Sequence, residues 1–344
     1  MKPSVKDVAA LANVSTATVS RTFNTPDIVN EEVRQRVLEA ANQLGYYSNA
    51  AARALRHRRT RMIATMLPKL DDAIYAEAAN GIQQTLSEKG YVGILETSGF
   101  NNKKLSDRGR HLIERGAEGL LVFGRIDDEE LLNHLKNFKI PVISLYSYLG
   151  EGEIPSIGID NYTAAEQIAN HIYDLNHQRV LMISGPTRGN DRQQHRIQAF
   201  QDVTTKRHGH SIVHEIDKDY SIDDAKAAFK EAFSRWNDVT ACICNSDIIA
   251  FGVLLACREM NINVPERLSV TGFDDINFST LLNPPLTTVS VPVAEIGRSA
   301  ALAMVEHLEH GLPIASRCIP SPLMKRESTM AISDSTIGSS QLRQ

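Results

Sequence analysis

Residues 5–24, VKDVAALANVSTATVSRTFN, decide how the N-terminal part of the chain folds. Apolar residues recur at helical spacing in the first half of this stretch, and Ser4 with Asp7 forms a capping-box pattern before it. Asn13 ends this pattern, and Ser15 caps a second one. The second helix places four side chains on one face: Thr16, Ala17, Ser20 and Arg21. Two short helices joined by a tight turn predict a helix-turn-helix, whose second helix can lie in a DNA major groove.

The next segment continues this helical unit and then becomes strongly basic. A third helix is expected after Asn30, with Gly45 as its C-cap. Residues 49–61, NAAARALRHRRTR, favour a helix, but Leu55 is their only large apolar side chain. Two interpretations stand for this segment. It is either a solvated linker helix, or a hinge helix that forms when its arginines contact DNA and Leu55 packs against an apolar surface.

Composition separates a basic head from an acidic body. The 344 residues carry a net charge of -4, whereas residues 1–61, with ten basic and five acidic side chains, carry +5. A head of this charge suits contact with phosphate. The chain shows neither a long apolar run nor the apolar core of a secretory signal, so we expect a cytoplasmic protein without a membrane span. The four cysteines lack the spacing of zinc or redox motifs, so we expect reduced cysteines in the core rather than a metal site.

From residue 62 onward, short apolar runs alternate with amphipathic stretches such as 74–89. Eight runs predict strands: 62–67, 91–95, 119–124, 141–145, 179–184, 211–216, 240–245 and 268–273. This rhythm predicts an α/β domain of two doubly wound parallel-sheet subdomains. Ligands of such sheets bind beyond the carboxyl ends of the strands, where this chain carries many polar and aromatic residues. A polyhydroxylated small molecule fits such loops.

The whole pattern resembles the lactose repressor and galactose repressor family of bacterial transcription regulators. The resemblance extends from residue 5 to residue 329. It is carried by VKDVAALANVSTATVSRTFN, by NEEVRQRVLEAANQLGYYSNAAARALR, and further on by NHQRVLMISGP, RIQAF, NSDIIAFG, LSVTGFDD, PPLTTVSVP and LMKRESTM. It implies a helix-turn-helix headpiece with a hinge helix, followed by an effector domain similar to type I periplasmic binding proteins.

The resemblance also implies the domain limits. The headpiece would comprise residues 1–48 and the hinge 49–61. The effector domain would span 62–333, followed by a disordered tail, 334–344. Within the effector domain, the N-subdomain would take about 62–160 plus 292–320, and the C-subdomain about 161–291 plus 321–333. The tail has no leucine heptads, so we expect a homodimer rather than a tetramer.

By the same resemblance, the headpiece would bind pseudo-palindromic operator DNA as a homodimer. Arg21 would form a bidentate contact with a guanine edge, while Thr16 and Ala17 would offer a hydroxyl and a methyl contact. Leu55 matches the leucine that such hinges insert into the minor groove. The full set of expected DNA contacts is Thr16, Ala17, Ser20, Arg21, Asn24, Asn49, Arg53 and Leu55.

For the effector, the resemblance implies a sugar or sugar phosphate held without any metal or other cofactor. The matching positions are Arg196, Asp274, Tyr220, Tyr75, Ser246 and Asp160. Two departures from the family pattern stand out. Ser48 replaces the usual hinge proline, and Ser246 replaces a longer asparagine. Asn245 is expected to point away from the ligand at its strand end.

The expected function is that of a sequence-specific DNA-binding repressor of a carbohydrate-utilisation operon, whose operator affinity is controlled by a small sugar-like effector. Relatives that respond to purines or nucleosides provide the nearest alternative. An α/β enzyme with a helical partner-binding head is a more distant one, because the chain lacks G-x-S-x-G, a P-loop and a G-x-G-x-x-G after a strand. A transport binding protein does not fit the DNA-binding head.

Overall fold

A computed structural model describes residues 3–24, 26–47, 59–99, 105–217 and 221–332. The chain divides into two compact units, Met1–Thr60 and Arg61–Gln344. Some of the expected features fall outside the described residues. These are most of the hinge helix with Ser48, Asn49, Arg53 and Leu55, the ligand position Tyr220, and the tail 334–344.

The first unit contains three α-helices around a small apolar core. They are α1 (Val5–Ala12), α2 (Thr16–Asn24) and α3 (Glu31–Leu44), with the short 3₁₀ helix η1 (Pro26–Ile28) before α3. The capping box is confirmed, since the Ser4 amide donates to the Asp7 carboxylate at 2.7 Å. Asn13 and Gly45 end their helices in the left-handed region, as expected. Val8, Val19 and Val37 are fully buried and hold the three helices together.

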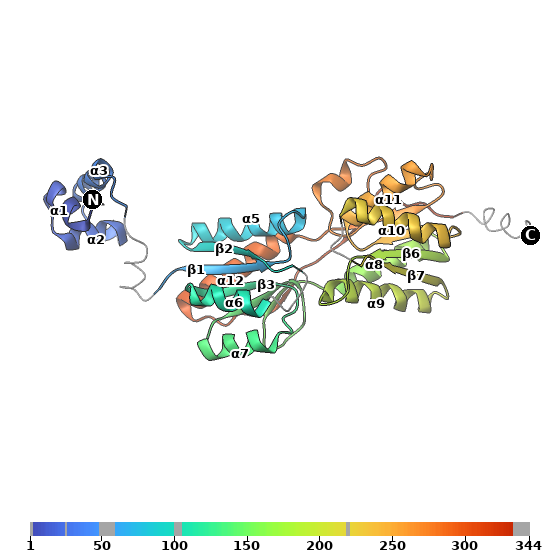
Figure 1. Ribbon diagram of the computed structural model, residues 1–344, viewed down its shortest axis with the longest axis horizontal. Coiled ribbons are helices and arrows are strands. Elements are labelled where there is room, and N and C mark those ends of the chain that lie inside the picture. The colour runs from blue at the N-terminus through green and yellow to red at the C-terminus, as the bar shows by residue number, and fades with distance from the viewer. Residues whose placement is uncertain (1–2, 25, 48–58, 100–104, 218–220, 333–344) are drawn as a thin grey trace, which may run out of the picture. The chain divides into compact units, whose positions relative to one another are not determined.

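The second unit is built on two parallel sheets. The first sheet has the order β11-β5-β4-β3-β1-β2. Its strands are β1 (Met62–Leu67), β2 (Val92–Thr97), β3 (Ala117–Phe123), β4 (Val142–Ser147), β5 (Ser156–Ile159) and β11 (Arg317–Cys318). Its helices are α5 (Ala73–Glu88), α6 (Leu105–Glu114), α7 (Glu129–Phe138) and α12 (Val293–His310). We call these elements the first lobe (Figure 1).

The second sheet has the order β7-β6-β8-β9. Its strands are β6 (Arg179–Ser184), β7 (His210–Glu215), β8 (Ala241–Cys244) and β9 (Ser269–Thr271). Its helices are α8 (Asn161–Asp174), α9 (Asp191–Lys206), α10 (Ile222–Arg235) and α11 (Asp247–Glu259), with the 3₁₀ helix η3 (Asn277–Thr280) after β9. These elements form the second lobe. A short antiparallel pair, β10 (Thr288–Val289) with β12 (Leu323–Met324), completes the unit.

Alternating side chains explain why helices cover both faces of each sheet. In β1, Ile63 and Leu67 pack into the core shared with α5 and α12, whereas Ala64 and Met66 pack into the core shared with α6 and α7. In the second lobe, α8 and α9 cover one face and α10 and α11 cover the other. In each sheet, the second strand along the chain lies on one side of the first strand and the third strand lies on the other side. Each sheet therefore has a topological switch point at the carboxyl ends of its strands.

The eight predicted strands are all confirmed as β1 to β4 and β6 to β9. Four strands were missed: β5, β10, β11 and β12. β5 is four residues long and the other three are two residues long, so none is long enough to show a periodicity. β10, β11 and β12 form through pairing with strands that are distant in the sequence, whereas β5 pairs with its sequence neighbour β4 as well as with β11.

The cysteines lie as free thiols in the structure. Cys242 and Cys244 share one face of β8 with their sulfurs 3.9 Å apart, and Cys257 is buried in the same core. Within the described ranges, no group of three or more His, Cys, Asp or Glu residues could hold a metal ion. No helix there is long and apolar enough to cross a membrane.

His177 is a buried histidine that ties the end of α8 to the chain after β12. Its Nε2–H donates to the Met330 carbonyl at 3.1 Å, and its Nδ1 accepts from the Thr240 hydroxyl at 2.9 Å. Burial lowers the pKa of His177 from 6.5 to about 4. The folded protein therefore holds this imidazole neutral at pH values where the unfolded chain already binds a proton.

We expect the free energy that His177 contributes to folding to be present above pH 6.5 and lost as the pH falls toward 4. The difference in unfolding free energy between the wild type and His177→Gln should therefore shrink by roughly 2–3 kcal/mol between pH 7.5 and pH 4.5. Urea unfolding at several pH values measures this difference, and all other titrating groups cancel in it. A difference independent of pH would contradict this assignment.

Candidate functional site

Arg196, on α9, is the centre of a buried polar cluster at the carboxyl ends of the strands. Its side chain is 3% exposed. Nε and Nη2 donate to Asn161 Oδ1 at 3.0 and 2.9 Å, and Nη1 donates to the Asn245 carbonyl at 2.7 Å. The guanidinium also lies 3.5 Å from the ring centroid of Phe273. This one side chain thus joins the start of α8, the end of β8 and the segment after β9.

Tyr146 and Asp274 extend the cluster from one lobe to the other. Arg196 Nη2 donates to the Tyr146 hydroxyl at 3.0 Å, and that hydroxyl donates to Asp274 Oδ1 at 2.5 Å. Tyr146 lies in β4 of the first lobe, while Asp274 follows β9 of the second. Burial raises the pKa of both groups well above their ordinary values. A change in how the lobes close would therefore have to break or remake this chain of hydrogen bonds.

The backbone at both ends of the Tyr146–Asp274 hydrogen bond is strained. Tyr146 has φ 75° and Asp274 has φ 119°, a region that side-chain-bearing residues rarely adopt. Such conformations persist only when the surroundings enforce them, and they concentrate at functional sites. The strain marks this hydrogen bond as part of the site.

Several buried polar atoms near Arg196 have no hydrogen-bond partner among the residues that the structure describes. Four of them lie at the start of α9 or at the end of β8: Asn190 Oδ1, Asp191 Oδ2, Gln193 Oε1 and Asn245 Nδ2. The Asn190 side chain also makes no capping bond to its helix. Buried polar atoms are normally paired, so this concentration indicates a place where a polar ligand supplies the missing partners.

Asp191 and Arg192 form a second buried charged pair beside this region. Arg192 Nη1 lies 3.3 Å from Asp191 Oδ1, and Arg192 and Asp191 are 5% and 7% exposed. Burial alone would raise the pKa of Asp191, but the Arg192 guanidinium and the hydrogen bond from the Arg125 amide hold it below its ordinary value. The site therefore contains one firmly ionised carboxylate, which can accept a hydrogen bond from a ligand hydroxyl.

Aromatic side chains border the cluster on the first lobe. Tyr75, near the start of α5, packs edge-on against Phe123 at 5.3 Å between ring centroids. Burial raises the pKa of Tyr75, and the charges of Arg192, Asp72 and Arg196 also act on its hydroxyl. Tyr75 therefore lies beside the charged groups of the cluster, where its ring can contact an apolar face of a ligand.

Three of the six predicted effector positions are thus brought together: Arg196, Asp274 and Tyr75. Two others serve as helix caps. Asp160 caps α8 by accepting from the Tyr162 and Thr163 amides, and Ser246 caps α11 by accepting from the Ile249 amide.

The sequence placed Tyr146, Asn161 and Arg192 in the polar loops beyond the strand ends but did not include them among the six effector positions. The expected direction of the Asn245 side chain stays a prediction, while the Asn245 backbone carbonyl accepts a hydrogen bond from Arg196. The available signal was position, since Tyr146, Asn161 and Asn245 stand at or just after strand ends.

The first unit offers a separate surface on α2. Thr16, Ala17 and Arg21 are exposed and Ser20 is half-buried, while Val19 faces the core. The Ser15 hydroxyl caps the helix by accepting from the Thr18 amide at 3.0 Å. A short, capped helix whose exposed face carries a hydroxyl, a methyl and an arginine can present these groups to base edges in a groove.

Comparison with known proteins gives the family of this chain. Residues 4–49 match the family described as "Bacterial regulatory proteins, lacI family", and residues 169–329 match a periplasmic binding protein-like domain. The chain is 30% identical over 333 residues to the HTH-type transcriptional repressor CytR of Escherichia coli (strain K12), covering 95% of this chain and 96% of that protein. This chain belongs to the lacI family.

Other lacI-family regulators are similar over nearly the same length. The ribose operon repressor of Bacillus subtilis (strain 168) is 31% identical over 319 residues, covering 93% of this chain and 95% of that one. Among solved structures, the transcriptional regulator CelR in complex with cellobiose is 28% identical, with a TM-score of 0.69. That comparison covers 95% of this chain and 99% of CelR. The chain is thus a DNA-binding regulator of this family.

Proposed function

We propose that this regulator is a repressor whose affinity for operator DNA is controlled by a small polyhydroxylated effector bound around Arg196. The observation that carries the proposal is the hydrogen-bond chain Arg196–Tyr146–Asp274, which joins the two lobes and lies beside unpartnered buried polar atoms. A ligand that forms hydrogen bonds with those atoms changes the free energy of the state in which the two lobes are closed. Binding of the effector around Arg196 can thereby change the affinity of the protein for operator DNA.

The chemistry of the site favours a sugar or sugar phosphate. Three of the four unpartnered atoms near Arg196 are oxygen acceptors, Asn190 Oδ1, Asp191 Oδ2 and Gln193 Oε1, which match ligand hydroxyl donors. The similar CelR structure is a complex with cellobiose, and another relative is named for the ribose operon. The Tyr75–Phe123 pair supports a second candidate, a nucleoside, since an aromatic edge also suits a base. Asp160, Ser246 and Tyr220 remain proposed contacts.

On the DNA side, we infer that α2 enters the major groove. Arg21 would read a guanine, with Thr16, Ala17 and Ser20 beside it, and the contacts would continue through Asn24 into the hinge at Asn49, Arg53 and Leu55. The net charge of +5 on residues 1–61 supports this role. We also propose that the protein acts in the cytoplasm, that it has no enzymatic activity, and that its headpiece, hinge and effector domain follow the limits expected from the sequence.

We propose that the second lobe carries the homodimer surface. A cavity of about 860 Å³ there is lined mainly by apolar residues of α11 and of the segment around η3, together with Asp71 and Ala73 of the first lobe and polar residues such as Arg258. Phe278 and Leu281 beside it are 63% and 77% exposed. Large exposed apolar residues around a concave apolar surface mark an interaction site. A pseudo-palindromic operator needs two copies of the headpiece, so the second copy of this chain is the occupant we propose.

Leu281→Asp should therefore convert the protein from dimer to monomer. A buried carboxylate without a partner costs several kcal/mol at an interface, and this substitution would place one in each subunit. Light scattering at micromolar concentration measures the mass. Phe138→Asp, which replaces a side chain that is 60% exposed on α7, serves as the matched control and should remain dimeric. A dimeric Leu281→Asp protein would refute this surface.

The proposed effector class is tested by a thermal-shift panel on the full-length protein. We would use ribose, ribose 5-phosphate, cellobiose, galactose, cytidine and adenosine. A sugar or sugar phosphate should raise the melting temperature and change operator affinity. Stabilisation by a nucleoside alone would favour the second candidate, whereas a ligand without effect on operator binding would contradict the regulatory role.

A further inference from the structure

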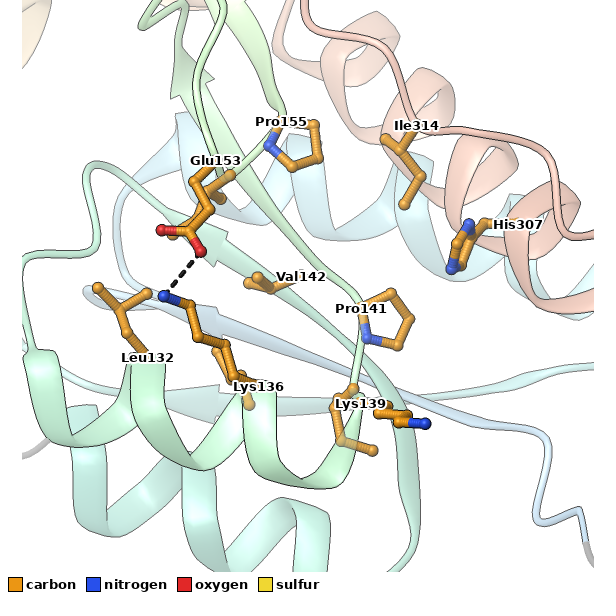
Figure 2. A pocket seen from close by; sticks show the side chains of 12 residues that line it. Leu132, Lys136, Lys139, Pro141, Val142, Glu153, Pro155, His307 and Ile314 are labelled. Atoms are coloured by element: carbon orange, nitrogen blue, oxygen red, sulfur yellow. Dashed lines mark ion pairs between the residues drawn. The ribbon is translucent and has the colours of Figure 1, made fainter.

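A further pocket, of about 380 Å³, lies at the amino-terminal end of β4 (Figure 2). The cluster around Arg196 lies at the carboxyl-terminal end of the same strand. The pocket lies between the C-terminal turn of α7, the start of β4, the segment before β5 and the C-terminal end of α12. β4 joins the two sites, since Val142 at its start lines this pocket and Tyr146 near its end belongs to the cluster around Arg196. Val142 and Tyr146 are four residues apart along the strand, which corresponds to roughly 13 Å, so the two sites are separate.

The lining of this pocket is mainly aliphatic. Six side chains supply most of it: Leu132, Leu135, Ile140, Val142, Ile154 and Ile314. All of them are half-buried except Leu135, which is buried. The chain around the pocket adds exposed apolar surface, with Phe138 60% and Leu312 50% exposed. A concave apolar surface of this size is within the range that binds small molecules.

The polar groups at the pocket are three basic side chains and one acidic one. Lys136 Nζ pairs with Glu153 Oε1 at 2.7 Å, and Figure 2 shows this pair on one side of the pocket and His307 on the other. His307 Nδ1 donates to the Leu312 carbonyl at 2.8 Å, which leaves Nε2 as the other ring nitrogen. Lys139 makes no ion pair with any carboxylate of the described ranges. The one acidic group is therefore already neutralised, and the remaining charge is positive.

We propose that this pocket binds a small amphipathic carboxylic acid. The hydrocarbon part would cover the aliphatic lining, and the carboxylate would pair with Lys139, with His307 beside it in the lining. An amine would meet only like charges and the neutralised Glu153. A phosphate dianion is more strongly hydrated, and a pocket with Lys139 as its cationic donor on an apolar lining offers it too few hydrogen bonds. The regulator would then carry a ligand site distinct from the proposed effector site.

The test is ligand-observed NMR and calorimetry on the full-length protein with octanoate, 3-phenylpropionate and phenylacetate. The matched probes are octanamide and 3-phenylpropionamide, which lack the charge, and succinate, which lacks the apolar part. At least one amphipathic carboxylate should bind with a Kd below about 1 mM, and its amide should bind at least about tenfold more weakly. Absence of binding by all three carboxylates, or equal binding of acid and amide, would overturn the proposal.

Two variants locate the bound acid. Lys139→Gln should weaken binding by about tenfold, and Ile314→Trp, which fills the pocket, should abolish it. Lys206→Gln, at a surface lysine 67% exposed on α9, is the matched control and should bind as the wild type does. Binding that survives both pocket variants would place the acid elsewhere and overturn the assignment. Thermal melting shows whether each variant is folded. If Ile314→Trp does not fold, the affinity of Lys139→Gln alone decides whether the acid binds in this pocket.

Discussion

Arg196→Ala should abolish the response to the effector while the protein still binds operator DNA. The substitution removes the guanidinium that bonds Asn161, Asn245 and Tyr146 and stacks on Phe273. These buried acceptors and the hydroxyl then lose their partner, which we expect to cost about 3–5 kcal/mol of unfolding free energy in the second unit. The headpiece belongs to the other compact unit and keeps its DNA-reading surface.

Calorimetric titration with the compound that stabilises the wild type measures the loss, which should be at least about hundredfold in affinity. Arg207→Ala is the matched control. Arg207 lies at the end of the same helix and pairs with Asp174 at 2.8 Å on the surface, with its side chain 42% exposed. That pair should contribute at most about 1 kcal/mol, and effector binding should be unchanged. An Arg196→Ala protein that binds effector normally would exclude Arg196 from the site.

Arg21→Ala should remove the discrimination between operator and random DNA. A bidentate arginine contact to guanine contributes about 1–3 kcal/mol of discrimination, and a dimer makes it twice, so we expect a loss of roughly 2–6 kcal/mol. Effector binding should be unaffected, because the proposed effector site lies in the other unit. The operator for this measurement is obtained by selecting duplexes from a random library with the wild-type protein.

A loss of positive charge alone would weaken all DNA binding rather than selectivity. Arg34→Ala, on α3, tests this alternative because it removes one half-buried arginine that pairs with Glu31. It should lower affinity for both DNAs by a similar factor and leave their ratio unchanged. Equal ratios for Arg21→Ala and the wild type would exclude Arg21 as the reader of a base.

The fold could be predicted largely from local signals. Ser4, Asn13 and Gly45 determine where the first-unit helices begin and end, and they act through contacts within a few residues of themselves. The long strands also follow from their apolar runs. β11 escaped prediction because it consists of two exposed residues that pair with β5, far away in the sequence. Such strands depend on tertiary pairing and carry no local pattern.

The candidate site was predictable only in part. Arg196 and Asp274 could be carried over from matching motifs, but Tyr146 could not, because its role depends on a hydrogen bond to a residue 128 positions away. Its positive φ is equally invisible in the sequence. Strand alternation predicts where the Asn245 side chain points, but it could not predict that the Asn245 backbone carbonyl accepts a hydrogen bond from Arg196.

The most direct test of the central claim measures operator binding by the full-length protein. Fluorescence anisotropy gives the Kd with and without the effector identified in the panel. Coupling between two sites usually amounts to about 1–3 kcal/mol, so the effector should change the Kd for operator by roughly 5–150-fold. The change should disappear in Arg196→Ala. An effector that binds at Arg196 yet leaves the Kd for operator unchanged would contradict the account.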